Sequence, residues 1–117
     1  MSVLGAIYDA LVPGGEVIIG TGNASSIYGP TARYMDFTHE TLFTETSLRQ
    51  VLLASGFIDV DVSDTKVNFG LQPKRFVRWI ALKLFRTALR LSFVLEVGDN
   101  APRLLGKLII ARACKPK

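Results

Sequence analysis

The sequence predicts an α/β fold in which three short strands form one sheet and helices flank it. Three observations lead to this prediction. Apolar residues recur at helical spacing in 3–11 and 44–55, the runs 17–19 and 108–111 are wholly apolar, and residues 57–64 alternate between apolar and polar. The chain has 117 residues, of which 49% are hydrophobic, so its size and composition suit a single domain over 1–117.

A turn separates the first helix from the first strand. The helical repeat consists of Val3, Leu4, Ile7, Tyr8 and Leu11. It stops at Pro13-Gly14-Gly15, because proline cannot continue a helix and glycine accepts the turn. Val17–Ile19 follows as a continuous apolar run, which predicts a strand that is covered on both faces.

The second helix has predicted signals at both ends. Thr44 is a suitable N-cap, Glu45 favours the positive end of the helix dipole, and Phe43 can pack on Leu48. Gly56 is placed to end the helix. The expected buried stripe is Leu48, Val51 and Leu52.

Two later strands differ in their patterns, and this difference predicts their order in the sheet. In 57–64 the apolar residues Ile58, Val60 and Val62 alternate with polar ones, which is typical of an edge strand or of one wet face. Residues 108–111 are apolar without a break, which predicts an interior strand.

An ordered series of short motifs resembles the second half of class I S-adenosylmethionine-dependent methyltransferases. The series starts with Leu-Val-Pro-Gly-Gly at 11–15 before a strand and continues with Thr21-Gly22-Asn23. The run 33–40, the stretches 43–45 and 47–49, and the closing Ala54-Ser55-Gly56-Phe57 complete it. The resemblance covers residues 2–65 well and the last strand more loosely, and residues 66–103 carry no motif of the family.

The resemblance implies the C-terminal half of a doubly wound, Rossmann-like sheet, with its last strand antiparallel and inserted between the two others. In that family the cofactor lies on the first strands, beside a Gly-rich turn and an acidic residue. Only ten residues precede Leu11, so we expect no cofactor-binding residue in this chain. S-adenosylmethionine is the implied cofactor, the chain alone is expected to be inactive, and the resemblance leaves open that Met1 is an internal methionine.

The segment after the first strand borders the acceptor substrate in the family, so residues 21–40 hold the candidate site. The substrate-facing candidates are Asn23, Tyr28, Arg33, Tyr34 and Asp36. His39 is the candidate catalytic base, because histidine titrates near neutral pH and can take the proton of an attacking oxygen or nitrogen. Two of these candidates have a plainer alternative. His39 can be a local hydrogen-bonding residue, and Arg33 can form a salt bridge with Asp36 or Glu40.

Gly20-Thr21-Gly22 directly follows a predicted strand, as the start of a dinucleotide fingerprint does. The third glycine is missing, since Ser25 stands there, and Ile27-Tyr28-Gly29-Pro30 is not expected to open a helix. A flexible loop is therefore preferred to a nucleotide-binding loop.

The charge is uneven: residues 1–71 carry −5 and residues 72–117 carry +9. The later part includes a predicted basic amphipathic helix over 72–97, inserted between the last two strands, whose cations fall within roughly 140° of one another. They are Arg75, Arg78, Lys83, Arg86 and Arg90. Two alternatives follow: peripheral contact with a membrane surface through these residues, or packing of the apolar face on the sheet between its edge strand and its last strand.

Several classes of site and location are disfavoured. One histidine and one cysteine cannot form a common zinc site, a single cysteine forms no intrachain disulfide, and no secretory signal is recognisable. Nucleic acid is not a favoured partner. We therefore expect a cytoplasmic protein, in contact with the membrane surface if the basic helix binds there. Its expected function is methyl transfer to a small-molecule or glycan acceptor, and the alternative is a non-catalytic adaptor held at a membrane or an anionic partner by the basic helix.

Overall fold

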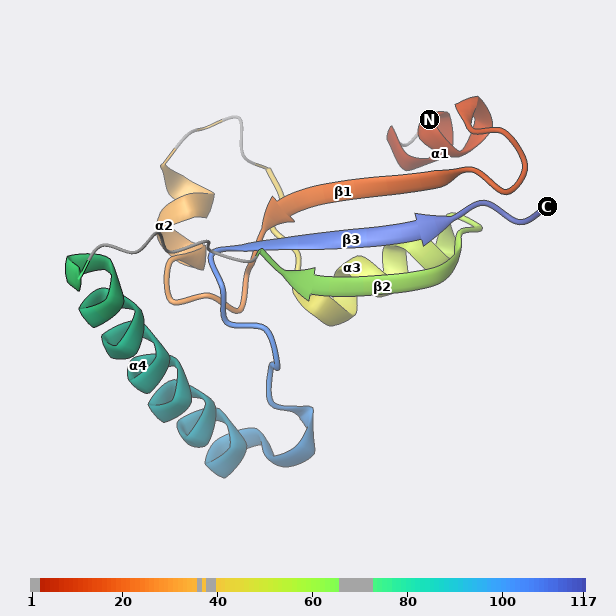
Figure 1. The fold of residues 1–117 in the computed structure, drawn as a ribbon. Helices are drawn as coiled ribbons and strands as arrows, with labels where there is room; N and C mark the ends of the chain where they lie inside the picture. Colours follow the sequence, from red (N-terminus) through yellow and green to blue (C-terminus); the bar gives the residue numbers. More distant parts are fainter. Residues whose placement is uncertain (1–2, 36, 38–39, 66–72) are drawn as a thin grey trace.

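The computed structural model describes residues 3–35, 37, 40–65 and 73–117, and Figure 1 shows their path. The elements in chain order are helix α1 (Val3–Ala10), strand β1 (Glu16–Gly22), helices α2 (Gly29–Tyr34) and α3 (Glu45–Ala54), strand β2 (Ile58–Asp64), helix α4 (Pro73–Val97), the 3-10 turn η1 (Gly98–Asn100) and strand β3 (Leu108–Cys114).

The last strand lies in the middle of the sheet. The strand order is β1-β3-β2, and β3 runs antiparallel to both neighbours. Ala111 is paired with Ile19 on one side and with Val62 on the other. The predictions that residues 58–64 form an edge strand and that 108–111 form an interior one are confirmed.

One face of the sheet carries the core. Helix α3 lies across this face, and Figure 1 shows it behind β2 and β3. The buried cluster consists of Leu48, Leu52, Phe57, Val60, Val62, Ile109, Ala111 and Ala113. Helix α1 adds Tyr8, whose ring meets that of Phe57 edge to face at 5.1 Å between centroids. The core is therefore built by α1 and α3 against alternate residues of the strands.

No described element covers the opposite face of the sheet, which corrects one prediction. Val17 and Ile19 are half-buried on the core side, whereas Ile18 between them is 61% exposed. An unbroken apolar run gives no information on whether a covering layer exists, so the expectation that both faces are covered was wrong for this chain.

The ends of α3 follow the predicted chemistry. The Thr44 hydroxyl accepts from Ser47 N at 3.1 Å, and the Ser47 hydroxyl accepts from Thr44 N at 2.9 Å. Gly56 adopts a φ of 92°, which L side chains rarely adopt. The reciprocal bond from Ser47 was not predicted, since a glutamate or glutamine usually occupies that place.

Two predictions about the segment after β1 are wrong. Gly20-Thr21-Gly22 belongs to β1 and pairs with residues 108–110 of β3, so it forms no loop. Residues 29–34 form α2, with Pro30 in its first turn. Proline is tolerated there because the first amide N–H groups of a helix have no partner within the helix.

Strand β2 contains one irregularity. Asp59 has a positive φ of 52°, and the register with β3 shifts between Ile58 and Asp61. A bulge of this kind turns the residues before it out of the regular alternation. Ile58 is accordingly 44% exposed, although the alternating pattern assigned it to the buried face.

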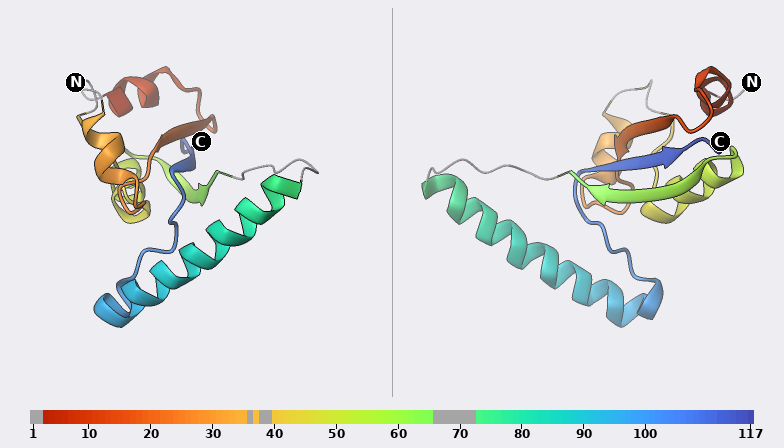
Figure 2. Two further views of the ribbon diagram at one scale, coloured as in Figure 1. Left: turned by 90° about the vertical axis from the view of Figure 1, so that its left-hand side faces the viewer. Right: turned by 45° about the vertical axis from the view of Figure 1, so that its right-hand side comes forward.

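Helix α4 extends away from the sheet, as the two views of Figure 2 show. None of its residues is buried, and Leu84, Leu91 and Leu95 are 60% exposed or more. The expectation that this apolar face packs on the sheet is wrong. The partly covered stripe is instead Leu82, Arg86, Leu89 and Phe93. Arg86 lies close enough to Asp64 of β2 for its charge to act on that carboxylate, so the side of α4 that carries Arg86 is the covered one.

Candidate functional site

Asn23 fixes the end of β1 to the segment that enters β3. Its amide nitrogen donates to the carbonyls of Leu104 at 2.8 Å and Gly106 at 2.9 Å, and its carbonyl oxygen accepts from Ser25 N at 2.9 Å. Its own backbone N–H donates to Lys107 O at 3.1 Å. The side chain is 1% exposed, so it presents no surface to an acceptor. The expectation that Asn23 faces the substrate is therefore replaced by a positioning role.

Asp64 holds the same segment from the other outer strand. Gly106 N donates to Asp64 Oδ1 at 3.2 Å. Burial raises the pKa of Asp64 above its ordinary value of 3.8, while the Arg86 charge and the Gly106 N–H act to lower it. Asn23 and Asp64 thus form a clamp on residues 104–106, which we call the β3 entry segment.

The turn between Asn23 and Gly29 is compact. Ser26 is buried, its N–H donates to Asn23 O at 3.1 Å, and its carbonyl accepts from Gly29 N at 2.8 Å. A Cβ at Gly29 would lie 2.7 Å from Ala24 O, so only glycine fits there. Sequence reasoning missed Ser26, although an Asn followed by serines is a known turn pattern.

An open cavity of about 380 Å³ lies beside α2. It is lined by Ala24, Gly29, Pro30, Arg33, Tyr34, Glu40, Thr41 and Leu42. Two of the predicted residues, Arg33 and Tyr34, meet here, with the Arg33 guanidinium carbon 5.7 Å from the centre of the Tyr34 ring. The cavity therefore presents a cation, an aromatic ring and a carboxylate to one space.

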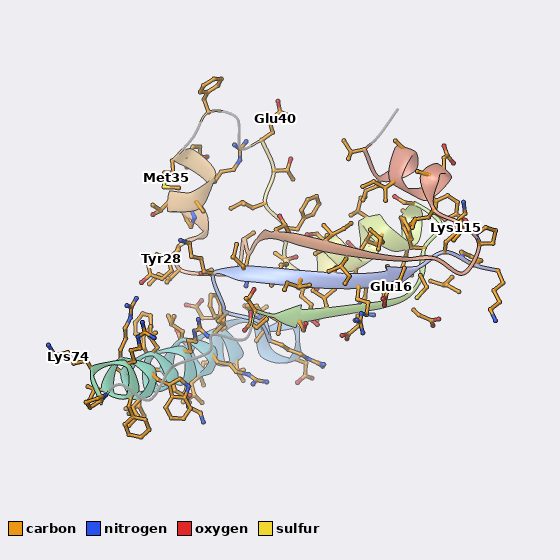
Figure 3. All side chains as sticks on the ribbon, turned by 45° about the horizontal axis from the view of Figure 1, so that its top comes forward. Glu16, Tyr28, Met35, Glu40, Lys74 and Lys115 are labelled. Atoms are coloured by element: carbon orange, nitrogen blue, oxygen red, sulfur yellow. The ribbon has the colours of Figure 1, made fainter. Side chains whose placement is uncertain are left out.

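Among the described candidates, Asn23 and Tyr28 do not line this cavity. Tyr28 is 55% exposed, and Figure 3 shows it at the start of α2, with Met35 at the far end and Glu40 on the neighbouring segment. Asp36 and His39 lie outside the described residues, so their roles stay predictions.

A second open cavity has a volume of about 610 Å³. It is lined by Ser25, by Thr44, Glu45 and Thr46 at the start of α3, and by residues 99–103. Sequence reasoning missed it because residues 99–103 carry no motif and lie far along the chain from residue 25. Both cavities lie at the carboxyl end of β1, where open α/β sheets bind their ligands.

The glycine pairs before and within β1 do not form a turn that would hold S-adenosylmethionine. Binding of that kind requires a Gly-rich turn that leads from a strand into a helix. Gly14 and Gly15 lie before the amino end of β1, and Gly20 and Gly22 lie within it. No glycine turn of the required kind is therefore formed by either pair.

Metal and membrane-spanning sites were also sought in the parts of the chain that the structure describes. These parts contain no group of three or more His, Cys, Asp or Glu residues that could hold a metal ion. No described helix has both the length and the apolar character needed to cross a bilayer.

Comparison with solved structures identifies the fold. A S-adenosylmethionine-dependent methyltransferase from Archaeoglobus fulgidus matches 97% of this chain over 50% of its own length, at 17% identity and a TM-score of 0.56. A possible histamine N-methyltransferase from Thermotoga maritima matches 96% of this chain over 46% of its own, at 15% identity and a TM-score of 0.56. Phosphoethanolamine N-methyltransferase 2 of Haemonchus contortus matches 98% over 29%, at 19% identity and a TM-score of 0.50.

The chain thus spans half or less of the length of these structures. No protein-family model matches the chain, and no curated protein matches it in sequence. The fold is that of a class I methyltransferase: the C-terminal half of the Rossmann-like sheet, with the last strand antiparallel and inserted.

Proposed function

We propose that this chain is the acceptor-binding part of a S-adenosylmethionine-dependent methyltransferase that methylates a small-molecule or glycan acceptor. The observation that carries the proposal is the cavity at the carboxyl end of β1, in a sheet with the methyltransferase strand order. The cofactor would be held by residues that are not among those described here.

The residues that line the cavity suit a polar acceptor. Arg33 and Glu40 offer opposite charges to the same space, so the cavity can bind a group with both a donor and an acceptor, such as a sugar hydroxyl. Tyr34 gives an aromatic face against which a ring can stack. His39, one residue before Glu40, would take the proton that the acceptor nucleophile loses as it gains the methyl group.

The test uses the product of the whole reading frame that contains this chain. Methyl transfer from labelled S-adenosylmethionine to panels of small molecules and glycans is measured, together with the affinity for the cofactor. His39→Ala should lower turnover by roughly 10²-fold or more. Arg33→Ala should raise the KM for the acceptor, and both variants should bind the cofactor as the natural protein does.

Arg112→Ala is the matched control. Arg112 lies on β3, where its Nε is 2.8 Å from Glu16 Oε1 and both side chains are largely exposed. Its loss should leave the acceptor kinetics unchanged. If the affinity for the cofactor falls in the Arg33 and His39 variants while their acceptor kinetics stay the same, the proposed acceptor side is wrong.

The non-catalytic adaptor is the second candidate, and the exposed apolar face of α4 favours it. An adaptor would transfer no methyl group in any panel. A separate calorimetric titration of the 117-residue chain with S-adenosylmethionine should show no saturable heat under either candidate, and micromolar binding would contradict the assignment of cofactor residues to another part of the fold.

A further inference from the structure

One long stripe of α4 is apolar and has no partner in the described structure. At about 100° per residue its members fall within about 60° of one another around the helix axis. They are Val77, Ile80, Leu84, Leu91 and Leu95, and all five side chains are exposed. At 1.5 Å per residue, the stripe from Val77 to Leu95 gives a straight apolar surface about 27 Å long.

The charges of α4 lie on both sides of this stripe. The helix holds six cations and one acid, Glu96. Lys83 and Arg90 lie on one flank and Lys74 and Arg78 on the other, at about 80–120° from the centre of the stripe. This is the distribution of an interfacial helix, whose apolar face enters the acyl boundary while long cationic side chains reach the headgroups.

The amino-terminal part of α4 adds an aromatic group of the kind found at membrane interfaces. Trp79 stacks on Phe76 with 5.9 Å between ring centroids, and Lys83 Nζ lies 4.8 Å from the centre of the Trp79 ring. At 100° per residue Trp79 lies about 140° from the centre of the stripe, beyond Lys83, so it would lie with the headgroups and not among the inserted leucines. Trp79 is the only tryptophan of the chain, so its fluorescence reports on α4 alone.

We propose that α4 binds in the plane of a bilayer that contains anionic phospholipid, with its leucine stripe inserted and its cations on the headgroups. A bilayer is favoured over a protein partner because it matches two features at once: the straight apolar stripe and the cations on both of its flanks. This inference does not depend on methyl transfer.

The experiment is flotation of the 117-residue chain with phosphatidylcholine vesicles, with and without phosphatidylglycerol, together with the emission spectrum of Trp79. The chain should float only with the anionic vesicles, its emission should shift to the blue, and high salt should release it. Lys83→Glu with Arg90→Glu should lower the partition coefficient at least about 30-fold. Leu84→Ser with Leu91→Ser should abolish the blue shift.

Each pair of substitutions has a matched control. Lys107→Glu with Lys117→Glu changes the net charge equally at exposed sites outside α4 and should reduce the binding far less. Leu53→Ser removes an exposed leucine from α3 and should leave the blue shift intact. If the charge reversal alters the far-ultraviolet circular dichroism, Lys83→Gln with Arg90→Gln replaces it and should still weaken binding.

Three outcomes would overturn the proposal. They are no flotation with either vesicle, flotation that is equal for both and independent of salt, and equal loss of binding in the Lys107 and Lys117 control. A concentration-dependent dimer that the Leu84 and Leu91 substitutions dissociate, without vesicle binding, would assign the stripe to a second copy of this chain instead.

Discussion

Helices α3 and α4 are both amphipathic, yet only the shorter one has a buried face. Helix α3 has ten residues, a reciprocal cap at its start and two buried leucines, Leu48 and Leu52. Helix α4 has 25 residues and no buried one. The difference shows that amphipathic character predicts a helix but not what its apolar face contacts. Helix α3 is joined to β2 by the short segment 55–57, whereas α4 is joined to β3 by the longer segment 98–107.

The sharpest test of this comparison is to replace one leucine in each helix with alanine. Leu52→Ala should reduce the free energy of unfolding by about 2–5 kcal/mol, because it leaves a cavity in the core. Leu91→Ala should change it by no more than about 0.5 kcal/mol, because that side chain is already exposed. Both are measured by chemical denaturation. A cost for Leu91→Ala as large as that for Leu52→Ala would mean that α4 packs in solution.

A smaller effect is expected at the clamp on the β3 entry segment. Asn23→Ala should cost about 1–3 kcal/mol, because it leaves the carbonyls of Leu104 and Gly106 and the N–H of Ser25 without their partner. Asn100→Ala, at an exposed position of η1, is the control for loss of an asparagine. Equal unfolding free energies for the two variants in denaturant titrations would show that the clamp contributes nothing.

The smallest effect concerns the other half of the clamp and depends on pH. Because the folded pKa of Asp64 is raised, the stability linked to its protonation is complete below pH 3.8 and is lost as the pH rises through the folded pKa. Asp64→Asn can still accept from Gly106 N and carries no charge. It should match the natural chain in acid and be more stable at pH 7, by about 0.5 kcal/mol or less.

Thermal unfolding of both chains from acid to neutral pH measures this difference. A less stable Asp64→Asn variant at pH 7 would show that the attraction of Arg86 outweighs the cost of burying the Asp64 carboxylate.

The parts of the fold that local chemistry determines were predictable. Thr44 and Gly56 mark the ends of α3 through cap and turn geometry, and the contrast between 58–64 and 108–111 gave the strand order. The outer face of β1 was not predictable, because an apolar run is the same whether or not a second layer covers it. The start of α2 at Gly29 was missed because proline was treated as excluding a helix rather than as opening one.

The candidate site was only partly predictable for a different reason. Arg33 and Tyr34 lie in the segment that the family motif marks, and they line one cavity. Asn23 donates to carbonyls 81 and 83 residues away, and no local pattern reveals such partners. The second cavity was missed for the same reason, because Ser25 and residues 99–103 line it together although they lie far apart along the chain.

The central place of β3 has a consequence for the order of events during synthesis. Strands β1 and β2 make their sheet contacts through β3, which is the last element of the chain. A nascent chain that has reached residue 107 therefore holds two strands without the strand that joins them, and Asn23 has only just gained its carbonyl partners. Unpaired apolar strands are prone to aggregate. A chain that stops before Leu108 should accumulate as insoluble protein, although it already contains every residue that lines the candidate acceptor cavity.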